Sequence, residues 1–352
     1  MTTPAIRERE PPRLGEAVLE VGDLRMYYTT SAGEVKAVDG LNFSVKRGEV
    51  LGVVGESGCG KTSLALTIMK LLPSNGKIRS GRILIRGSDV VPMSDTEIRR
   101  KIRWSEVALI PQGAMNALNP IFKVGDQISE VIMAHSLTSR AEARKKTEEL
   151  LVLVGIDPSR ASHYPHEFSG GMKQRAMIAM SLALDPSLLI ADEPTTALDV
   201  IVQAGIVRLL LDVKKRLGIS IILISHDLAL VAQMSEKVAI MYAGKFVEFG
   251  TSVDVYGLPL HPYTLGLLGA FADIRKPKEK LTAIPGSPPD LLDPPSGCRF
   301  RTRCKYAQEL CATAEPPLEE ALPGHLVACH FWKDIKENRA PINLGKWGEA
   351  KA

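Results

Sequence analysis

Residues 50–62 read VLGVVGESGCGKT, a short apolar run that leads into a glycine-rich turn. The turn from Gly55 to Thr62 matches the phosphate-loop pattern GxxxxGK(S/T). The run before it predicts a strand over 50–54, and the apolar spacing after it predicts a helix over 62–72. In that setting the glycines let backbone N–H groups face a β-phosphate, Lys61 reaches the β and γ oxygens, and the Thr62 hydroxyl can bind Mg²⁺. We therefore predict a nucleotide site formed by Gly55, Ser57, Gly58, Cys59, Gly60, Lys61, Thr62 and Ser63.

A second motif follows further along the chain. Residues 188–193 read LLIADE, an apolar run that ends in two carboxylates. Such a pair on its own is usually an exposed strand end, but with a phosphate loop upstream it matches a Walker B strand. Asp192 would hold Mg²⁺, directly or through water, and Glu193 would polarise the attacking water as general base. Because Glu193 is present, we expect the chain to hydrolyse ATP rather than only bind it.

Length and composition bound the class of protein. The 352 residues are 45% apolar and 24% charged, enough for one large core and a smaller appended module. The net charge of +4 is too small to suggest sequence-independent binding to nucleic acid. Apolar runs such as residues 219–224 are far shorter than the roughly 18 to 20 residues that a membrane helix needs. Residues 1–14 lack the apolar stretch of a secretory signal, so we expect a cytoplasmic protein.

The hydrophobic pattern alternates between strand and helix. Apolar and polar residues alternate over 18–28 and 35–45, which predicts two antiparallel strands separated at Gly33. Further strands are predicted over 83–85, 107–110, 187–191 and 220–225, and helices over 126–154 and 201–217. Buried strands that alternate with helices indicate a parallel sheet. The expected fold is an α/β three-layer core with an inserted helical subdomain at about 113–184.

The chain divides into unequal parts. Residues 1–16 are predicted to be a disordered lead-in, and 17–270 to form the ATPase domain. A connector rich in Lys and Pro then resists regular structure, with prolines at Pro285, Pro288, Pro289, Pro294 and Pro295. A small C-terminal extension over 271–335 carries a cysteine module, and 336–352 form a tail.

Residues 168–174, FSGGMKQ, resemble the signature motif of ABC-type ATPases, and they lie between the phosphate loop and the Walker B strand as in that family. The resemblance extends to Gln112 as the Q-loop, Asp199 as the D-loop and His226 as the switch histidine. It implies a P-loop NTPase cassette with a RecA-like core, an antiparallel β-subdomain and an inserted α-helical subdomain. Many members carry Gln where this chain has Met172, but Ser169 and the backbone would supply the phosphate contacts.

The same resemblance implies roles for individual residues. Ser169, Gly170 and Gly171 would face the ATP held by a partner cassette, so that two ATP molecules lie in a head-to-tail dimer. Tyr28 would stack on the adenine, although Tyr27 competes for that role. Catalysis is assigned to Glu193, His226 and Gln112, a nucleotide contact to Asp199, and Mg²⁺ binding to Thr62, Gln112 and Asp192.

Four short strings resemble the ATP-binding subunits of oligopeptide and dipeptide ABC importers. They are LNP at 118–120, GDQI at 125–128, HPYT at 261–264 and IPG at 284–286. This resemblance implies a motor that drives peptide uptake from the cytoplasmic face of the cell membrane. Its partners would be a second, homologous cassette, two permeases and, indirectly, an extracellular solute-binding protein. Because the motor never contacts the cargo, uptake of oligosaccharides or nickel stays an alternative.

Four of the five cysteines, Cys298, Cys304, Cys311 and Cys329, lie in the last sixth of the chain. In a reducing cytoplasm such clustering points to a metal site rather than disulfides. In the importer branch a similar pattern holds a [4Fe–4S] cluster in several members, which implies such a cluster here, with a structural role. Four thiolates can also bind tetrahedral Zn²⁺, but wide spacing without a C-x2-C pair favours the cluster. Cys59 is not expected to be a ligand.

Three rival classes are less consistent with the sequence. Soluble ABC proteins of DNA maintenance carry long heptad coils, which are absent here. Translation factors of this superfamily hold two cassettes, whereas this chain has one phosphate loop and one signature. Export instead of import is disfavoured only by the importer resemblance.

Overall fold

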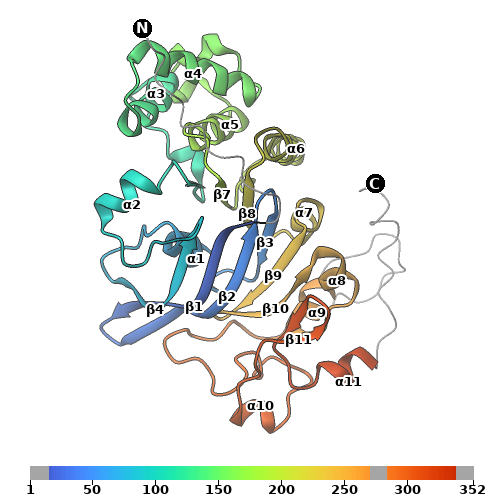
Figure 1. The fold of residues 1–352 in the computed structure, drawn as a ribbon. Helices are drawn as coiled ribbons and strands as arrows, with labels where there is room; N and C mark the ends of the chain where they lie inside the picture. Colours follow the sequence, from blue (N-terminus) through green and yellow to red (C-terminus); the bar gives the residue numbers. More distant parts are fainter. Residues whose placement is uncertain (1–15, 270–283, 338–352) are drawn as a thin grey trace.

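The computed structural model describes residues 16–269 and 284–337, and Figure 1 shows their arrangement. The lead-in expected over 1–16 lies outside these residues except for its last position. The Lys-rich first part of the connector and nearly all of the predicted tail also lie outside them.

The first sheet is antiparallel, with strand order β2-β1-β4-β5. The predicted pair over 18–28 and 35–45 is confirmed, because β1 pairs with β2 and Thr30 lies opposite Gly33 at the turn. The strand predicted over 83–85 is longer than expected and begins at residue 76. The bounds are β1 Ala17–Thr30, β2 Gly33–Lys46, β4 Gly76–Ile85 and β5 Ser88–Asp89.

The second sheet has strand order β11-β12-β10-β9-β3-β8-β7-β6, and β9, β3, β8, β7 and β6 run parallel. The strands predicted over 50–54, 107–110, 187–191 and 220–225 are confirmed within a residue. Strands β9 and β10 are additional to the predicted set. The bounds are β3 Val50–Val54, β6 Val107–Ile110, β7 Leu188–Asp192, β8 Ser220–Ser225, β9 Lys237–Tyr242 and β10 Lys245–Thr251.

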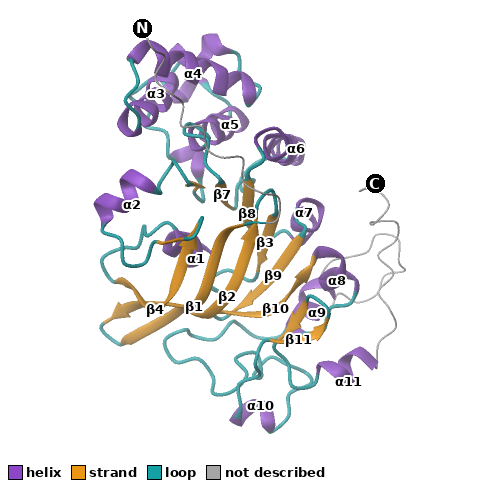
Figure 2. Cartoon of the chain, viewed as in Figure 1, coloured by secondary structure: helices purple, strands orange, loops and turns teal. Residues whose placement is uncertain are grey.

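Alternate residues of the parallel strands enter two different cores. Val50 and Val54 pack with the helices on one face, whereas Leu51 and Val53 pack with α1 and the antiparallel sheet on the other. Both faces are therefore covered, as the apolar runs require, and the predicted three layers are confirmed (Figure 2). The helices of this part are α1 Lys61–Ile68, α6 Val200–Leu217, α7 Leu228–Met234, α8 Ser252–Gly257 and α9 Pro262–Gly269.

Helix α1 ends earlier than the predicted 62–72. Lys70 has a left-handed φ of 47°, and its Nζ donates to the carbonyl oxygens of Val91 and Met93. A residue in this backbone region cannot continue a helix. The chain therefore turns away after the C-cap residue Met69.

Helices gather between β6 and β7 in the sequence and stand at one end of the molecule in Figure 1. The single helical stretch predicted over 126–154 is broken in two, because Ser139 and Glu142 form a capping box that starts a new helix. The bounds here are α3 Val124–His135, α4 Arg140–Leu153 and α5 Gly170–Ser181, with 3₁₀ turns η1 Ala114–Asn116, η2 Pro158–Ser162 and η3 Pro165–Glu167. Helix α2, Asp95–Lys101, precedes β6.

The C-terminal extension is joined to the main sheet. Strand β12 pairs antiparallel with β10, with Val327 opposite Glu248. Phe300 is 3% exposed, and its ring lies 5.2 Å from that of Tyr242 and 5.4 Å from that of Tyr263. The extension therefore shares the core of the cassette. Its elements are α10 Leu310–Thr313, β11 Glu319–Leu322, β12 His325–Val327 and α11 Trp332–Glu337.

The proline-rich segment after residue 284 has no helix or strand up to α10, as predicted. Among the described residues, no helix has both the length and the apolar character to span a lipid bilayer.

Candidate functional site

The predicted site residues meet at the carboxyl ends of the parallel strands. The phosphate loop follows β3, Gln112 follows β6, Glu193 follows β7 and His226 follows β8. These four strands are neighbours in the sheet. The carboxyl edge of such a sheet is where open α/β folds bind ligands.

The phosphate loop is shaped by glycines that no other residue can replace. Gly60 has a φ of 110°, and a Cβ there would lie 2.0 Å from the carbonyl oxygen of Ala37. A Cβ on Gly55 would lie 2.1 Å from the carbonyl oxygen of Met241. These contacts are far inside van der Waals distance, so the loop can pass here only without side chains.

Lys61 lies inside the loop that precedes it. The side chain is 6% exposed, and Nζ donates to the carbonyl oxygens of Gly55 at 2.7 Å and Glu56 at 2.9 Å. Burial raises the pKa of the Cys59 thiol, despite the nearby ammonium of Lys61 that acts in the opposite direction. An ammonium held at the centre of a ring of backbone groups is suited to a phosphate ligand.

Asp192 is a buried carboxylate with an unsatisfied oxygen. It is 2% exposed, and its Oδ1 has no hydrogen-bond partner among the described residues. Burial raises the pKa of Asp192, and a hydrogen bond from Thr62 partly opposes that shift. A cation beside Thr62 and Asp192 would satisfy the orphaned oxygen and favour the ionised form. The pair therefore fits a Mg²⁺ that is completed by phosphates and water.

Glu193 is the centre of a polar cluster. Its Oε2 accepts from Gln112 Nε2 at 3.2 Å and from Thr196 Oγ1 at 3.0 Å, and its Oε1 lies 3.2 Å from His226 Nδ1. Burial alone would raise the pKa of Glu193, but hydrogen bonds to His226 and Thr196 outweigh it and leave the pKa below its usual value. The carboxylate is therefore ionised near neutral pH, as a general base must be.

The backbone at Glu193 is strained. Its φ is 49°, a region that residues other than glycine seldom occupy, and its N–H donates to Ile224 of the neighbouring strand at 2.9 Å. Such strain often accompanies functional positions. The sheet therefore holds the side chain in a fixed place beside His226.

The two adjacent tyrosines have different surroundings. The Tyr28 hydroxyl donates to Ser63 Oγ in α1 at 3.1 Å, whereas the Tyr27 hydroxyl donates to Asp39 at 2.7 Å. Only Tyr28 therefore contacts the helix that follows the phosphate loop through its hydroxyl. The predicted stacking role of Tyr28 stays a prediction.

The signature residues lie at the start of α5. Ser169 is the N-cap, is exposed, and accepts from the Met172 N–H at 3.3 Å. Gly170 and Gly171 begin the first turn, so their N–H groups have no acceptor within the helix, and the predicted contact with a partner's ATP stays a prediction. Asp199 is likewise an N-cap, of α6, and accepts from the Val202 N–H.

One predicted assignment near Glu193 stays untested by these contacts. The Gln112 amide contacts Glu193, and its predicted Mg²⁺ contact stays a prediction. Sequence reasoning also missed Thr196, which donates to Glu193. The only available signal was its position three residues after Glu193, in a turn where a hydroxyl can reach back.

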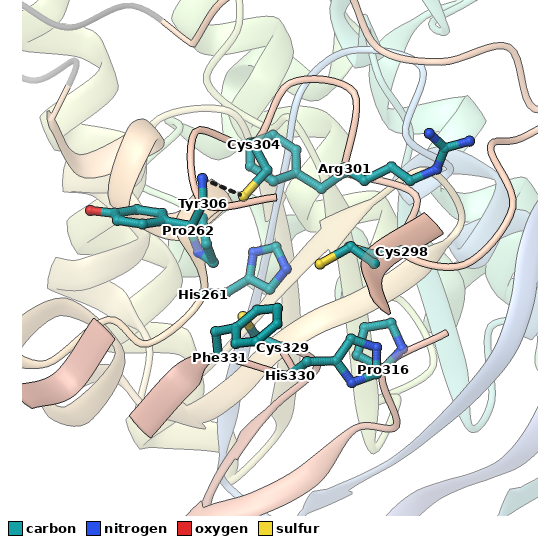
Figure 3. A pocket seen from close by; sticks show the side chains of 12 residues that line it. His261, Pro262, Cys298, Arg301, Cys304, Tyr306, Pro316, Cys329, His330 and Phe331 are labelled. Atoms are coloured by element: carbon teal, nitrogen blue, oxygen red, sulfur yellow. Dashed lines mark hydrogen bonds between the residues drawn. The ribbon is translucent and has the colours of Figure 1, made fainter. Parts of the chain in front are cut away.

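The four C-terminal cysteines line one pocket. Cys298, Cys304, Cys311 and Cys329 border it together with His261 and Phe300, and Figure 3 shows three of the cysteines around that histidine. Burial raises the pKa of Cys298 to about 11 and that of Cys329 to about 12. The Tyr306 N–H donates to Cys304 Sγ at 3.4 Å.

The pocket bears on the predicted metal in two ways. The described residues contain no group of three or more His, Cys, Asp or Glu side chains placed to hold a metal ion, a finding that applies to Zn²⁺ and to a cluster alike. The cavity is also small, about 10 Å³. A [4Fe–4S] cluster would therefore have to spread the four thiol-bearing loops, and its presence stays a prediction.

Comparisons with known proteins agree with this geometry. The ABC transporter family model matches residues 38–196, and the model of the oligopeptide/dipeptide transporter C-terminal region matches residues 247–311. The oligopeptide transport ATP-binding protein OppD of Escherichia coli K12 is 47% identical over 324 residues, which cover 92% of this chain and 95% of that protein. The dipeptide transport ATP-binding protein DppD of Bacillus subtilis 168 is 46% identical over 339 residues, 96% of this chain and 99% of that protein.

A solved structure is similar as well. MJ0796, a bacterial ABC transporter cassette determined as a dimer, is 25% identical with a TM-score of 0.60, and the match covers 66% of this chain and 98% of that one. The first family match contains the phosphate loop, Ser169 and Glu193, and the second contains the first three of the four clustered cysteines.

Proposed function

This chain belongs to the ABC transporter ATP-binding proteins of the oligopeptide/dipeptide family, and from that premise we propose that it powers the uptake of oligopeptides or dipeptides. It is the ATP-hydrolysing motor of an ABC importer. The observation that carries the motor role is the convergence of Gln112, Glu193 and His226 at the carboxyl edge that also bears the phosphate loop. The peptide cargo rests on the named relatives.

In the proposed reaction the loop binds the triphosphate through backbone N–H groups and Lys61. Nζ now rests on two carbonyl oxygens of the loop, and phosphate oxygens would replace those acceptors. Thr62 and Asp192 would hold Mg²⁺, which neutralises charge that develops on the β and γ oxygens. Glu193 would accept a proton from the attacking water, while His226 and Thr196 orient its carboxylate.

The signature would act on a second cassette. Ser169 is exposed, and the N–H groups of Gly170 and Gly171 in the first turn of α5 have no partner within the helix. We propose that these groups complete the γ-phosphate site of a homologous partner cassette. Closing two cassettes around ATP would then move two permeases through the helices near 112–128, with a solute-binding protein outside the cell and this subunit at the cytoplasmic face of the membrane.

The cargo is tested by reconstituting the purified assembly with its permeases and solute-binding protein. Peptides are expected to raise the ATPase rate, whereas oligosaccharides and nickel are not. Stimulation by an oligosaccharide or a metal, and none by any peptide, would remove peptide uptake and keep the motor role.

For the cysteine pocket we propose a [4Fe–4S] cluster held by Cys298, Cys304, Cys311 and Cys329. The support is that four thiols border one cavity, and backbone N–H groups are directed at the sulfurs of Cys298, Cys304 and Cys329, as in protein clusters. When bound, the cluster would cross-link the segment around residues 298–311 to β12. Protein purified without oxygen should contain iron and acid-labile sulfide, and stoichiometric zinc without iron would overturn this assignment.

A further inference from the structure

One arginine of the C-terminal extension contacts the phosphate loop directly. Arg303 Nη1 lies 2.6 Å from Glu56 Oε2, and Nη2 lies 2.9 Å from Oε1. The pair is therefore bidentate, the geometry in which arginine binds a carboxylate most specifically. The Arg303 side chain is 4% exposed and that of Glu56 is 27% exposed.

Arg303 is held in place from its other side. Its Nε donates to the carbonyl oxygen of Pro285 at 2.7 Å, and Nη2 donates to that of Gly286 at 3.2 Å. The guanidinium also lies 5.8 Å from the ring centroid of Tyr242, a cation–π distance. The Arg303 guanidinium therefore has a fixed position beside Glu56.

Glu56 contacts the phosphate-loop lysine, Lys61, through its backbone. Its carbonyl oxygen accepts from Lys61 Nζ at 2.9 Å, and its N–H donates to the Tyr263 hydroxyl at 2.8 Å. A single residue of the loop thus joins Arg303 on one side to Lys61 on the other. A shift of Glu56 would therefore also move the carbonyl oxygen that accepts from Lys61 Nζ.

The ion pair between Arg303 and Glu56 also neutralises a negative charge in the phosphate loop. Without Arg303, the partly exposed Glu56 carboxylate would be an unpaired negative charge in a loop that must bind a triphosphate. Like charges at short range in a partly buried site repel strongly, and an unpaired carboxylate there has lost much of its hydration. Arg303 therefore both fixes the loop and removes a charge that opposes ATP.

We propose that Arg303 is a positioning residue of the nucleotide site, through which the C-terminal extension keeps the phosphate loop competent for ATP. This inference rests on the proposed nucleotide role of the loop from Gly55 to Thr62. It assigns to the extension a function in ATP binding that is separate from any metal at the cysteines.

The test compares Arg303→Met with Arg299→Met in the full chain, purified with its partner subunits. Arg299 is the comparison variant, because its side chain is 9% exposed, belongs to the same extension, and pairs with Asp39 and the Ala243 carbonyl rather than with a side chain of the phosphate loop. It is linked to the loop through backbone, since the N–H of Gly244, next to Ala243, donates to the Cys59 carbonyl oxygen at 2.9 Å. Each arginine also adjoins one clustered cysteine. Equilibrium binding gives the Kd for ATP, steady-state kinetics give KM and kcat, and iron content and Tm monitor the extension.

Arg303→Met should raise the Kd and KM for ATP about tenfold, which corresponds to about 1.4 kcal/mol, while kcat changes less than threefold. Arg299→Met should leave Kd and KM within twofold. Adding Glu56→Gln to Arg303→Met should recover most of the lost affinity, since it removes the unpaired carboxylate. If Arg303→Met does not fold, Arg303→Lys keeps the charge without the bidentate geometry and should raise Kd about threefold.

Several results would overturn the inference. An unchanged Kd in the Arg303 variants would do so, as would an equal rise in the Arg299 control. A failure of Glu56→Gln to restore any affinity would also contradict it, because the unpaired carboxylate would then have no part in the loss. Absence of ATP binding by the unaltered chain would instead reject the proposed function, and this inference with it.

Discussion

Replacing Glu193 by Gln should abolish turnover and leave ATP binding intact. The substitution keeps the shape of the side chain and removes its charge. The remaining carbonyl oxygen can still accept from Gln112 and Thr196, which lie 3.2 and 3.0 Å from Oε2. The new amide would then face His226 Nδ1 in place of Oε1. Since Glu193 makes none of the contacts that hold Lys61, the phosphate loop should be unaffected.

The size of the effect follows from the lost proton acceptor. A positioned general base contributes about 10²- to 10⁴-fold to a rate, so kcat should fall by that factor, about 2.7 to 5.5 kcal/mol. The Kd for ATP should change less than threefold. Because closure no longer ends in hydrolysis, the variant should also accumulate as an ATP-dependent dimer with its partner cassette, measurable by size-exclusion chromatography.

A graded control uses Thr196→Val, which removes one hydrogen bond to Glu193 and leaves the base. One such bond is worth about 0.5 to 1.5 kcal/mol, so kcat should fall roughly two- to twelvefold. Glu193→Gln with an unchanged ATPase rate would refute the base assignment. If kcat fell further in Thr196→Val than in Glu193→Gln, the assignment of Glu193 as the base and of Thr196 as the residue that orients it would be refuted.

Three further outcomes are expected. Lys61→Ala should weaken ATP binding at least tenfold, measured by equilibrium binding, because it removes the cation at the centre of the loop; unaltered affinity would contradict its placement. Gly60→Ala should lower Tm and eliminate ATP binding, because the new Cβ would meet the carbonyl oxygen of Ala37 at 2.0 Å; a variant with normal Tm and affinity would show that the loop is less constrained. Burial raises the pKa of Asp39, but a hydrogen bond from Tyr27 and the neighbouring cations Lys245 and Arg299 outweigh it and leave the pKa below its usual value. The stability from this group is therefore present above that value and lost as pH falls through the lowered pKa. Asp39→Asn should accordingly lower Tm at pH 7, with a difference that shrinks in the acid range; a constant difference would argue against the shift.

The short-range features of the site could be predicted from sequence. The phosphate loop, the strand ending at Asp192 and the helix after Ser169 are each encoded within about a dozen consecutive residues, where apolar period and glycine placement dictate local structure. The predicted helix bounds were wrong where a backbone turn or a capping side chain ended a helix. Lys70 ended α1 early, and Ser139 divided a predicted helical stretch in which helix-forming residues dominate.

Contacts between distant segments needed the folded chain. Neither the choice of Tyr28 over Tyr27 as the residue against α1 nor the convergence of Gln112 and His226 on Glu193 follows from spacing along the chain. Strand alternation places neighbouring side chains on opposite faces, but only the packed sheets decide what each face meets.

By itself, the sequence determined that this protein binds a nucleotide, because the groups that hold phosphate lie in one continuous loop. Only the tertiary structure decided that this loop contacts the C-terminal extension. Arg303 and Glu56 are 247 residues apart, and no local pattern marks two such residues as partners. Their meeting depends on β12 joining β10 and on Phe300 entering the shared core, which places the extension against the phosphate loop.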